Sequence, residues 1–369
     1  MKILILDHYY PAFITDFYKK NPEINCKSYK DQKKSILDMS FGTADFYSKN
    51  LTQLGYKAVE IIINNEILQK RWAKENNISF FNGYFQSIPK LKNIFKTNWN
   101  EKILEAQIKI FSPDIIYCQN LSYPSQNFLK KIKKNVKLII GQAACPINFD
   151  KKKLAAFDLI LTSFPHFVEK FKKIGINSQY FKIGFEKSII DKLKKTEKQY
   201  DAVFIGGISK HHLEFIDILE FLAKNIKIDF WGYGFEKLDK DSPILKNYHG
   251  KIWGIDMYNI LYNSKISINR HIDAAENFAN NMRIYESTGV GAMLITDYKK
   301  NIGDLFKAGE EIETYKTKTE LIEKIKYYLA DERARKKIAE AGQRRVLKNH
   351  TYEHRMRELI SIITEYSSY

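Results

Sequence analysis

The sequence alternates short apolar runs with longer segments of helical period, and the alternation continues almost to its end. The apolar runs are rich in Ile and Val and lack a polar residue at every second position, which is typical of parallel strands covered on both faces. In the first half of the chain, strands are expected at Lys2–Leu6, Ala58–Ile63, Asp114–Cys118, Val136–Gly141, Leu159–Thr162 and Tyr180–Ile183. Helices are expected between them, at Thr43–Leu54, Glu66–Glu75, Glu101–Phe111, Gln126–Lys134 and Phe167–Lys173. This order predicts a doubly wound α/β sheet.

A second series of the same kind follows a polar, lysine-rich stretch at Lys192–Gln199, which we interpret as a linker. Its strands are expected at Ala202–Ile205, Lys227–Trp231, Lys265–Ile268 and Ala292–Thr296. A capping box at Thr317 and Glu320 opens a helical last part, with helices expected at Leu321–Leu329, Asp331–Leu347 and Tyr352–Tyr366. We therefore predict two tandem Rossmann-like domains, residues 1–191 and 200–349, and a helix over 350–369 that packs back on the first domain.

The chain is strongly basic: Lys and Arg total 60 against 43 Asp and Glu, a net charge of +17. The positive electrostatic potential of such a chain favours anionic partners, namely nucleotides, phosphorylated sugars, nucleic acid or an acidic membrane surface. Hydrophobic residues make up 44% of the chain, which excludes a largely disordered protein. Three cysteines without pairing or metal-binding spacing indicate a reducing, cytoplasmic compartment.

The N-terminal apolar run is too short for a signal peptide, and no run approaches the roughly 20 residues needed to cross a bilayer. We therefore expect a cytoplasmic protein. Lysine clusters at Lys130–Lys134, Lys151–Lys153 and Lys170–Lys173 are either solvated faces or a surface for the inner face of the plasma membrane. Phe128 and Ile132 beside the first cluster favour the membrane surface.

Two glycines follow the first strand of the second series and lead into a helix. Backbone N–H groups at Gly206 and Gly207 could approach a phosphate closely, and Ser209 and Lys210 would add a hydroxyl and a cation. The GxGxxG spacing and the Gly-Lys-Ser/Thr ending of a P-loop are both missing, which argues against a dinucleotide or ATP site. An ordinary tight turn between strand and helix is the alternative.

A short helix late in the second series carries the most chemical information. Asn280 or Asn281 can cap its start, and Gly289 lies where a left-handed C-terminal residue belongs. Arg283 and Glu286 stand three residues apart and therefore share one helix face. They could bind an anion and two vicinal hydroxyls, respectively, or form a plain surface ion pair.

An aromatic loop with two glycines, Tyr248–Gly254, precedes another helix of the second series. Gly250 and Lys251 at its centre could hold a nucleobase against exposed backbone. The alternative is a glycine-rich loop anchored by a core Trp.

One pair of histidines has metal-like spacing. His350 and His354 stand at i and i+4, as two ligands on one helix would, but no third ligand is evident. We therefore predict neither a metal site nor a resident cofactor.

Polar residues follow strands of the first series, at the edge where open α/β sheets place ligands. Asp7 and His8 come directly after the first strand, and either could act as a base or orient an acceptor; the same holds for Asp45. Other residues near these strand ends are candidates for contact with an acceptor: Phe41, Gly42, Thr43, Asn120 and His166. Each of them, taken singly, could equally serve the structure alone.

With two tandem Rossmann-like domains and a helical C-terminus, the chain resembles the GT-B glycosyltransferases, and more closely the group related to the spore-maturation protein CgeB. Four segments that together span nearly the whole chain carry the resemblance: Phe41–Tyr47 with Gln69–Ala73, Ser163–His166 through Gly184–Glu186, Met282–Gly291, and His350–Tyr352 with Arg355. Their order and spacing carry more weight than any single segment.

The resemblance implies a transferase whose second domain holds a nucleotide-sugar donor. It places the donor diphosphate between Gly206–Lys210 and Asn280–Arg283, the ribose on Glu286 and the base near Gly250–Gly254. The acceptor would enter from the first domain, near the strand-end residues named above.

The chain departs from the family pattern at one carboxylate. Many retaining relatives carry a second Glu seven residues before the one that holds the ribose. Here Ala279 stands seven residues before Glu286, and Glu276 stands ten before it. The carboxylate that would touch the donor sugar is therefore missing or displaced.

We therefore predict a metal-independent, retaining glycosyltransferase of hexosyltransferase type. It would move a sugar from a nucleotide-diphosphate donor to a glycan or lipid-linked acceptor in bacterial surface polysaccharide synthesis. A nucleotide-sugar epimerase of the same architecture is one alternative. The other is a non-enzymatic protein that binds nucleic acid or another polyanion, although the sequence carries no clear recognition motif of that kind.

Overall fold

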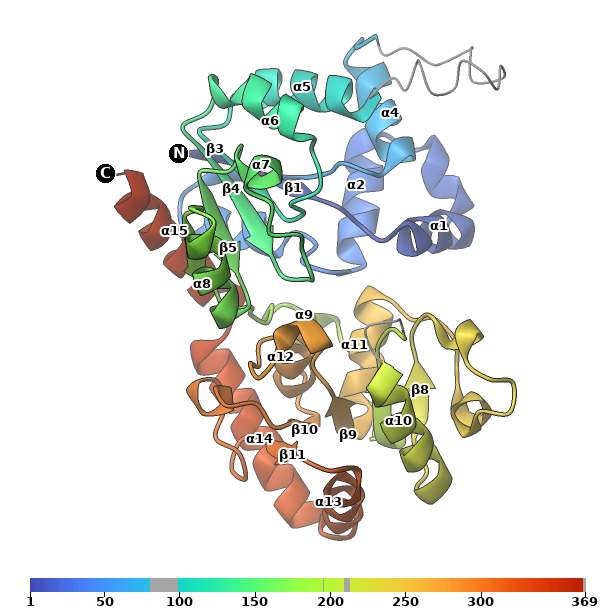
Figure 1. Ribbon diagram of the computed structural model, residues 1–369. Coiled ribbons are helices and arrows are strands. Elements are labelled where there is room, and N and C mark those ends of the chain that lie inside the picture. Colours follow the sequence, from blue (N-terminus) through green and yellow to red (C-terminus); the bar gives the residue numbers. More distant parts are fainter. Residues whose placement is uncertain (80–98, 195, 209–212, 368–369) are drawn as a thin grey trace. The chain divides into compact units, whose positions relative to one another are not determined.

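The structure is a computed structural model that describes residues 1–79, 99–194, 196–208 and 213–367. The chain divides into two compact units (Figure 1). The first consists of Met1–Thr162 and Phe167–Gln179, and the second of Ser163–His166 and Tyr180–Tyr369. The expected packing of residues 350–369 on the first domain stays a prediction.

The first unit is built on a six-stranded sheet in the order β2-β1-β3-β4-β5-β6. Its strands are β1 (Lys2–Asp7), β2 (Lys57–Ile62), β3 (Ile115–Cys118), β4 (Leu138–Ala143), β5 (Leu159–Thr162) and β6 (Ser178–Tyr180). The helices described between them are α1 (Pro11–Lys20), α2 (Tyr29–Asp38), α3 (Phe46–Gln53), α4 (Glu66–Glu75), α5 (Trp99–Phe111), α6 (Gln126–Lys133), α7 (Lys151–Leu154) and α8 (Pro165–Lys173). Neighbouring strands from β2 to β5 pair in parallel.

The second unit is built on a five-stranded parallel sheet in the order β11-β10-β9-β7-β8. Its strands are β7 (Tyr200–Ile205), β8 (Asp229–Trp231), β9 (Ser264–Asn269), β10 (Met293–Asp297) and β11 (Glu313–Tyr315). Its described helices are α9 (Ile189–Lys192), α10 (Leu213–Asn225), α11 (Gly254–Tyr262), α12 (Met282–Gly289), α13 (Lys318–Ala330), α14 (Glu332–Asn349) and α15 (Tyr352–Ser367). The prediction of two tandem Rossmann-like folds is confirmed.

Each sheet has one point where the direction of winding reverses. In the first unit the chain runs from β1 out to β2 and returns to the other side of β1 for β3. In the second unit it runs from β7 out to β8 and returns to the other side of β7 for β9. Open α/β sheets bind ligands at the carboxyl edge of such a switch point. The carboxyl ends of β1 and β3, and of β7 and β9, are therefore the expected ligand sites.

Most expected elements lie within a few residues of the observed ones, and β5 and α4 have the predicted bounds. The strand expected at Tyr180–Ile183 is wrong in its bounds, because the chain pairs over Ser178–Tyr180 and Ile183 N then donates to the side chain of Asn280. The helices α1 and α2 and the short strand β11 were not expected.

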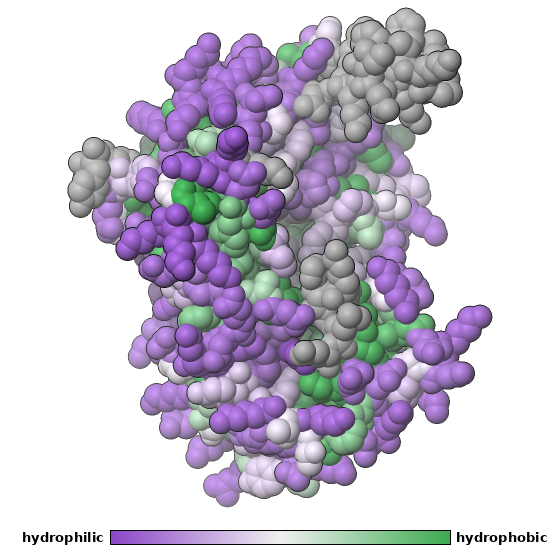
Figure 2. Space-filling model, in the orientation of Figure 1, coloured by the Kyte–Doolittle hydropathy of each residue, from purple (hydrophilic) through white to green (hydrophobic). Residues whose placement is uncertain are grey.

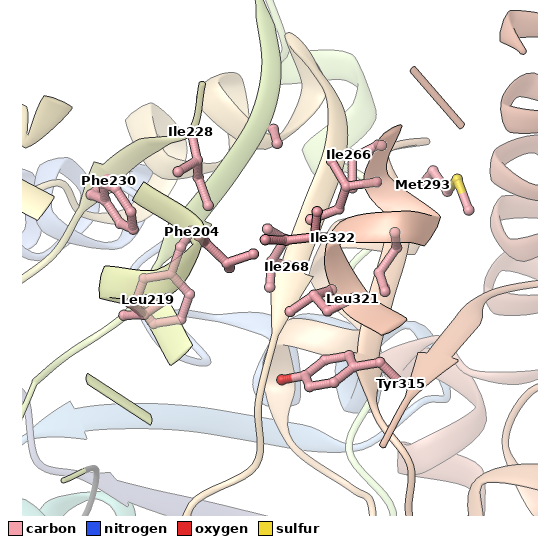
Figure 3. Close-up of a cluster of buried hydrophobic side chains, with 14 of the residues drawn as sticks. Phe204, Leu219, Ile228, Phe230, Ile266, Ile268, Met293, Tyr315, Leu321 and Ile322 are labelled. Carbon is pink, nitrogen blue, oxygen red and sulfur yellow. The ribbon is translucent and has the colours of Figure 1, made fainter. Parts of the chain in front are cut away.

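The core of the second unit lies between its sheet and the helices α10 and α13 (Figure 3). Phe204 on β7 and Ile268 on β9 lie among Leu219 from α10 and Leu321 from α13, and all four side chains are buried. Hydrophilic side chains cover most of the outside of the molecule that Figure 2 shows. None of the helices within the described ranges is long and apolar enough to cross a membrane.

Candidate functional site

Two segments of backbone lie against each other at the carboxyl edge of the second sheet. Gly206 N donates to Trp231 O at 3.0 Å and Ile208 N donates to Tyr233 O at 2.8 Å, so the segment after β7 contacts the segment after β8. A Cβ at Gly207 would lie 2.3 Å from the Tyr233 ring. A side chain at this position would fit only if the Tyr233 ring moved aside. Contact of Gly206 or Gly207 with a phosphate stays a prediction.

Ser209 and Lys210, expected beside the same phosphate, lie outside the described residues. Their phosphate contacts stay predictions as well.

The loop expected to hold the base has open backbone and an anchored aromatic ring. Gly250 has a φ of +91° and open space where a Cβ would stand, and its carbonyl accepts from Gly232 N at 3.0 Å. Lys251 beside it is exposed. Trp253 is buried, and its ring stacks on Tyr233 with centroids 5.9 Å apart. The loop thus combines the open backbone and the core Trp that the sequence offered as alternatives.

Helix α12 begins at this edge and carries a largely buried ion pair. Asn281 caps the helix, because its Oδ1 accepts from Ile284 N at 3.3 Å. Arg283 Nη1 lies 2.8 Å from Glu286 Oε2, and Tyr258 OH donates to Glu286 Oε1 at 3.3 Å. The side chains of Arg283 and Glu286 are only 15% and 8% exposed, so the plain surface pair is excluded.

The end of α12 corrects one prediction. Gly289 is the last residue of the helix, and the left-handed residue is Gly291, with a φ of +83°. Gly289 is needed for a different reason: a Cβ there would lie 2.5 Å from the ring of Phe185.

Asn280 and His166 connect loops within the second unit. Asn280 Nδ2 donates to Ser163 O at 2.9 Å, and its Oδ1 accepts from a tyrosine hydroxyl at 2.9 Å. His166 Nε2 lies 3.1 Å from Ala274 O, and its ring stacks on Phe278 with centroids 5.0 Å apart. Both side chains thus have structural partners, and their contacts with donor or acceptor stay predictions.

A second polar pair at this edge escaped the sequence reasoning. His271 follows β9, and its Nδ1 lies 2.8 Å from Oδ1 of Asp297, the last residue of β10. Lys299 Nζ lies 3.3 Å from the other oxygen of Asp297. Burial opposes the ionised carboxylate, but the hydrogen bond from His271 and the charge of Lys299 outweigh it and hold the pKa of Asp297 below its usual value. The sequence signal for the pair is a polar residue one to three positions after each of two apolar runs.

The switch point of the first unit holds the buried carboxyl group of Asp7. His8 N donates to Asp7 Oδ1 at 2.7 Å, while Thr43 Oγ1 lies 3.2 Å from Asp7 Oδ2 and 2.9 Å from Gln119 Oε1. Asp7 is 7% exposed. Burial raises the pKa of its carboxyl group to about 7, although the hydrogen bonds from His8 and Thr43 oppose the shift. A carboxyl group with such a pKa can exchange a proton near neutral pH.

His8 and Asp45, the other residues predicted for catalysis, lie in the same unit and are less buried. Burial lowers the pKa of His8. Burial raises the pKa of the Glu60 carboxyl group, and the positive charge of Lys33 opposes this rise. The negative charge of Asp45 raises the pKa of Glu60 further. Asp7 is thus the most enclosed of the three predicted catalytic groups.

The remaining residues expected at the acceptor site have structural contacts of their own. The ring of Phe41 stacks on Phe13 with centroids 4.0 Å apart. Gly42 has a φ of +60°, which favours glycine. Asn120 Oδ1 accepts from Ser122 N at 2.8 Å within a turn. Their contacts with an acceptor stay predictions.

Known proteins share parts of this architecture. Residues 214–361, within the second unit, match a family model described as Glycosyl transferase-like, and this segment contains the Arg283–Glu286 pair. The whole chain is similar to HepE from Anabaena, solved with UDP and glucose, at 12% identity and a TM-score of 0.61, with 99% of this chain and 100% of that chain covered. The chain has the GT-B glycosyltransferase fold. The resemblance to GT-B proteins is confirmed at this level, and the CgeB-like group stays a prediction.

The same fold occurs in two further solved GT-B proteins. Sucrose-phosphate synthase from Thermosynechococcus elongatus is 9% identical with a TM-score of 0.58, covering 99% of this chain and 98% of that one. A glycosyltransferase from Rickettsia africae is 15% identical with a TM-score of 0.59, at the same coverage of 99% and 98%. No curated protein sequence matches the chain. At these identities the likeness establishes the fold, and the chemistry depends on this chain's own residues.

Proposed function

We propose that this GT-B protein is a glycosyltransferase that moves a hexose from a uridine diphosphate donor to a hydroxyl group of an acceptor. The observation that carries the proposal is the buried Arg283–Glu286 pair on α12, inside the segment that matches the glycosyl transferase-like family. The structures of HepE with UDP and with UDP-glucose support the choice of base.

The leaving diphosphate needs positive charge, because it becomes more negative as its bond to the sugar breaks. Arg283 supplies a cation, and its Nε is buried with no hydrogen-bond partner within the described part of the chain. The N–H groups at the start of α12 add partial positive charge at the same edge. These groups would stabilise the leaving group without a metal ion. Loss of one such contact costs about 3 kcal/mol of transition-state stabilisation.

Glu286 has the capacity to hold the donor ribose. A carboxylate offers about four acceptor positions. Arg283 and Tyr258 each occupy one oxygen of Glu286, which leaves lone pairs on both oxygens for two vicinal hydroxyls. Tyr258 and Arg283 would thereby orient the carboxylate before the nucleotide arrives.

Asp7 is the group in the first unit best suited to receive the acceptor proton. As the oxygen of the acceptor attacks the anomeric carbon, its proton must leave, and a carboxylate with a pKa near 7 can take it at neutral pH. Thr43 and His8 N hold the two carboxylate oxygens in place.

The stereochemistry of transfer follows from which group takes that proton. Direct displacement with Asp7 as base inverts the anomeric centre. Retention, which the resemblance implies, would have the departing phosphate take the proton and leave Asp7 to orient the hydroxyl. The absence of a Glu at position 279 favours the first route, and NMR of the anomeric product distinguishes the two.

The proposed setting is synthesis of a bacterial surface glycan in the cytoplasm. The lysines of α6 support electrostatic attraction to an anionic surface, since Lys130, Lys131 and Lys133 are exposed. Phe128 and Ile132 are buried in the unit, so the helix has no apolar face for insertion into a membrane. Any membrane contact of this helix would therefore weaken steeply with salt.

A thermal-shift screen of UDP, GDP, dTDP and CMP compounds tests the donor, because a ligand that binds the native state raises the melting temperature. We expect UDP compounds to give the largest shift, and Glu286→Ala to abolish it. An unchanged shift in that variant would show that the site assignment is wrong.

Incubation of UDP-hexoses without an acceptor separates transferase from epimerase. An unaltered donor supports the transferase, whereas an isomerised sugar nucleotide supports the epimerase. Binding to duplex DNA with a steep salt dependence, and none to UDP compounds, would instead support the polyanion-binding alternative.

A further inference from the structure

A series of four hydrogen-bonded side chains joins the start of α12 to the ends of two strands of the second unit. Asn281 Oδ1 accepts from Ile284 N at 3.3 Å, and Asn281 Nδ2 donates to Asn269 Oδ1 at 2.9 Å. Asn269 Nδ2 donates to Thr296 Oγ1 at 2.9 Å, and Thr296 Oγ1 donates to Asp297 Oδ1 at 3.1 Å. We call Asn281, Asn269, Thr296 and Asp297 the α12 cap network. It runs from the first turn of the helix to the carboxyl ends of β9 and β10.

The direction of each hydrogen bond in the network is fixed by the one before it. The backbone N–H of Ile284 can only donate, so the Asn281 atom that faces it is the oxygen, and the amino group of Asn281 faces Asn269. Asn269 therefore presents its oxygen to Asn281 and its amino group to Thr296. The single hydroxyl proton of Thr296 is then left for the carboxylate of Asp297.

The far end of the network is a carboxylate that other donors hold in place. Asp297 Oδ1 also accepts from N and Nδ1 of His271 at 3.0 and 2.8 Å, and Lys299 Nζ lies 3.3 Å from Asp297 Oδ2. These groups keep the pKa of Asp297 below its usual value, although burial opposes the shift. An ionised carboxylate can only accept. The network therefore runs from a group that can only donate, Ile284 N, to one that can only accept.

The middle of the network is sealed inside the second unit. Asn269 is 3% exposed and Thr296 is fully buried, and the residues directly before them, Ile268 and Ile295, are buried and apolar. Replacing both partners of a buried hydrogen bond by apolar groups of the same shape costs little stability, so stability alone does not explain two polar side chains here. A fully satisfied polar network instead fixes one arrangement of the groups that it joins.

The group whose arrangement the network fixes is the first turn of α12. The Asn281 oxygen caps the N–H of Ile284, the third residue of the helix. The N–H groups of Met282 and Arg283 come before it, where the geometry of an α-helix offers no acceptor within the helix. Such N–H groups stabilise an anion at a helix start, and here the guanidinium of Arg283 stands in the same turn.

We propose that Asp297, Thr296 and Asn269 are positioning residues for the donor diphosphate. Through Asn281 they hold the first turn of α12 in the conformation in which its N–H groups and Arg283 bind the phosphates. The placement of the diphosphate at this helix start rests on the proposed function. Glu286, one turn further along, is held by Tyr258 from α11, so binding of the ribose should not depend on the network.

Thr296→Val tests the proposal, because valine keeps the shape of threonine and removes the hydroxyl that joins Asn269 to Asp297. In ligand-observed NMR titrations of the full chain, the Kd of UDP should rise about tenfold or more, and that of uridine should change by less than about twofold. Thr296→Ser keeps the hydroxyl and should restore UDP binding. Unchanged UDP binding in Thr296→Val, equal weakening of UDP and uridine, or no rescue by Thr296→Ser would overturn the proposal.

A second hydrogen bond between the same strand and the same helix provides the matched control. Ser267 Oγ of β9 lies 2.8 Å from Ser287 Oγ of α12, and both residues are fully buried. Ser267→Ala removes this bond and leaves the α12 cap network intact, so the Kd of UDP should stay within about twofold of the wild type. A loss of UDP binding equal to that of Thr296→Val would mean that any break between β9 and α12 has this effect, which would overturn the proposal.

Asn281→Ala is a second variant, at a half-buried position that tolerates substitution better than Thr296 does. It removes the cap itself, so UDP should bind about tenfold more weakly or worse while uridine is unaffected. Unchanged UDP binding in Asn281→Ala would overturn the proposal even if Thr296→Val failed to fold. Melting temperatures without ligand show which variants are folded.

The outcomes separate the network from the proposed function. UDP binding that is lost in Glu286→Ala but unchanged in Thr296→Val would support the proposed function and contradict the network. If UDP does not bind the wild type, the proposed function is wrong, and inorganic pyrophosphate becomes the probe. Pyrophosphate binding that Thr296→Val weakens and Ser267→Ala does not would then support the network. Absence of pyrophosphate binding, or equal binding by Thr296→Val, would overturn it.

Discussion

Arg283 and Glu286 form an ion pair of 2.8 Å on one face of α12, and both side chains are largely removed from water. A buried pair of this kind contributes little net stability, because the desolvation of two charges offsets their attraction. Removing one partner is costly, since the other charge is then left without compensation. The pair is therefore better explained by binding than by stability, with Glu286 presented to hydroxyls and Arg283 to an anion.

Glu286→Ala should abolish the UDP-induced rise in melting temperature and lower the free energy of unfolding by about 3 kcal/mol. The stability loss comes from the Arg283 guanidinium, which would be left buried without its carboxylate. Urea unfolding and thermal shift with and without UDP measure the two effects.

The matched control is an exposed pair with the same spacing. Lys307 and Glu310 lie 3.7 Å apart with side chains 69% and 70% exposed. Glu310→Ala should change the free energy of unfolding by less than about 0.5 kcal/mol and leave the UDP shift intact. Equal losses in Glu286→Ala and Glu310→Ala would contradict the special role of the α12 pair.

Gly289→Ala should destabilise the second unit by about 1–3 kcal/mol, because the added methyl group would lie 2.5 Å from the buried ring of Phe185. Gly303→Ala is the control, since nothing stands within 4 Å of a Cβ there and its φ lies outside the left-handed region that favours glycine. That variant should be neutral or slightly stabilising. Circular dichroism melts of the two variants check the contrast, and a neutral Gly289→Ala would show that Phe185 can move aside.

The sheets could be predicted from sequence because parallel strands covered on both faces are continuous apolar runs. Ile3 to Leu6 of β1 illustrates this, since each of its residues is buried. The edge strand β11, Glu313–Tyr315, has three residues and no such run, so it escaped prediction. Helix α2 escaped because polar and charged residues make up most of Tyr29–Asp38.

The candidate sites could be predicted only in part. Spacing along one helix placed Arg283 and Glu286 together, but no local pattern reveals that Tyr258 from α11 donates to Glu286. The proximity of Asp7, Thr43 and Gln119 depends on the register between β1 and β3, and that register is not encoded within either strand.

Gly207→Ala tests the contact between the segment after β7 and the ring of Tyr233. The methyl group would stand 2.3 Å from that ring, so we expect a loss of about 1–3 kcal/mol and weaker binding of UDP compounds. Tyr233→Ala should relieve the clash. The double variant should therefore lose about 1 kcal/mol less unfolding free energy than the two single variants lose together. A double-mutant cycle by urea unfolding measures this coupling. Additive losses would mean that the ring and the glycine act independently.

Asp7 should make the stability of the protein fall as the pH rises. Its carboxyl pKa is raised from an ordinary value of 3.8 to about 7, so the folded chain holds a proton that the unfolded chain has released between these values. The stabilisation is complete below pH 4 and is lost as the pH rises through 7, by about 4 kcal/mol at most. Asp7→Asn removes this loss. It should therefore be more stable than the wild type at pH 8 and similar to it at pH 4.5, as measured by urea unfolding at both values.

Ionisation of the same carboxyl group should make the activity rise with pH, whereas the stability falls. A base must be ionised to accept the acceptor proton, so kcat/KM should rise with pH through about 7 in the wild type. Asp7→Asn should lower kcat/KM by two or more orders of magnitude, which is the usual size of a general-base contribution. The same substitution should remove the pH step. His8→Gln separates the two neighbouring groups: burial lowers the pKa of His8, so a step due to His8 would lie below 6.5. A step near 7 that survives in Asp7→Asn would show that another group takes the proton.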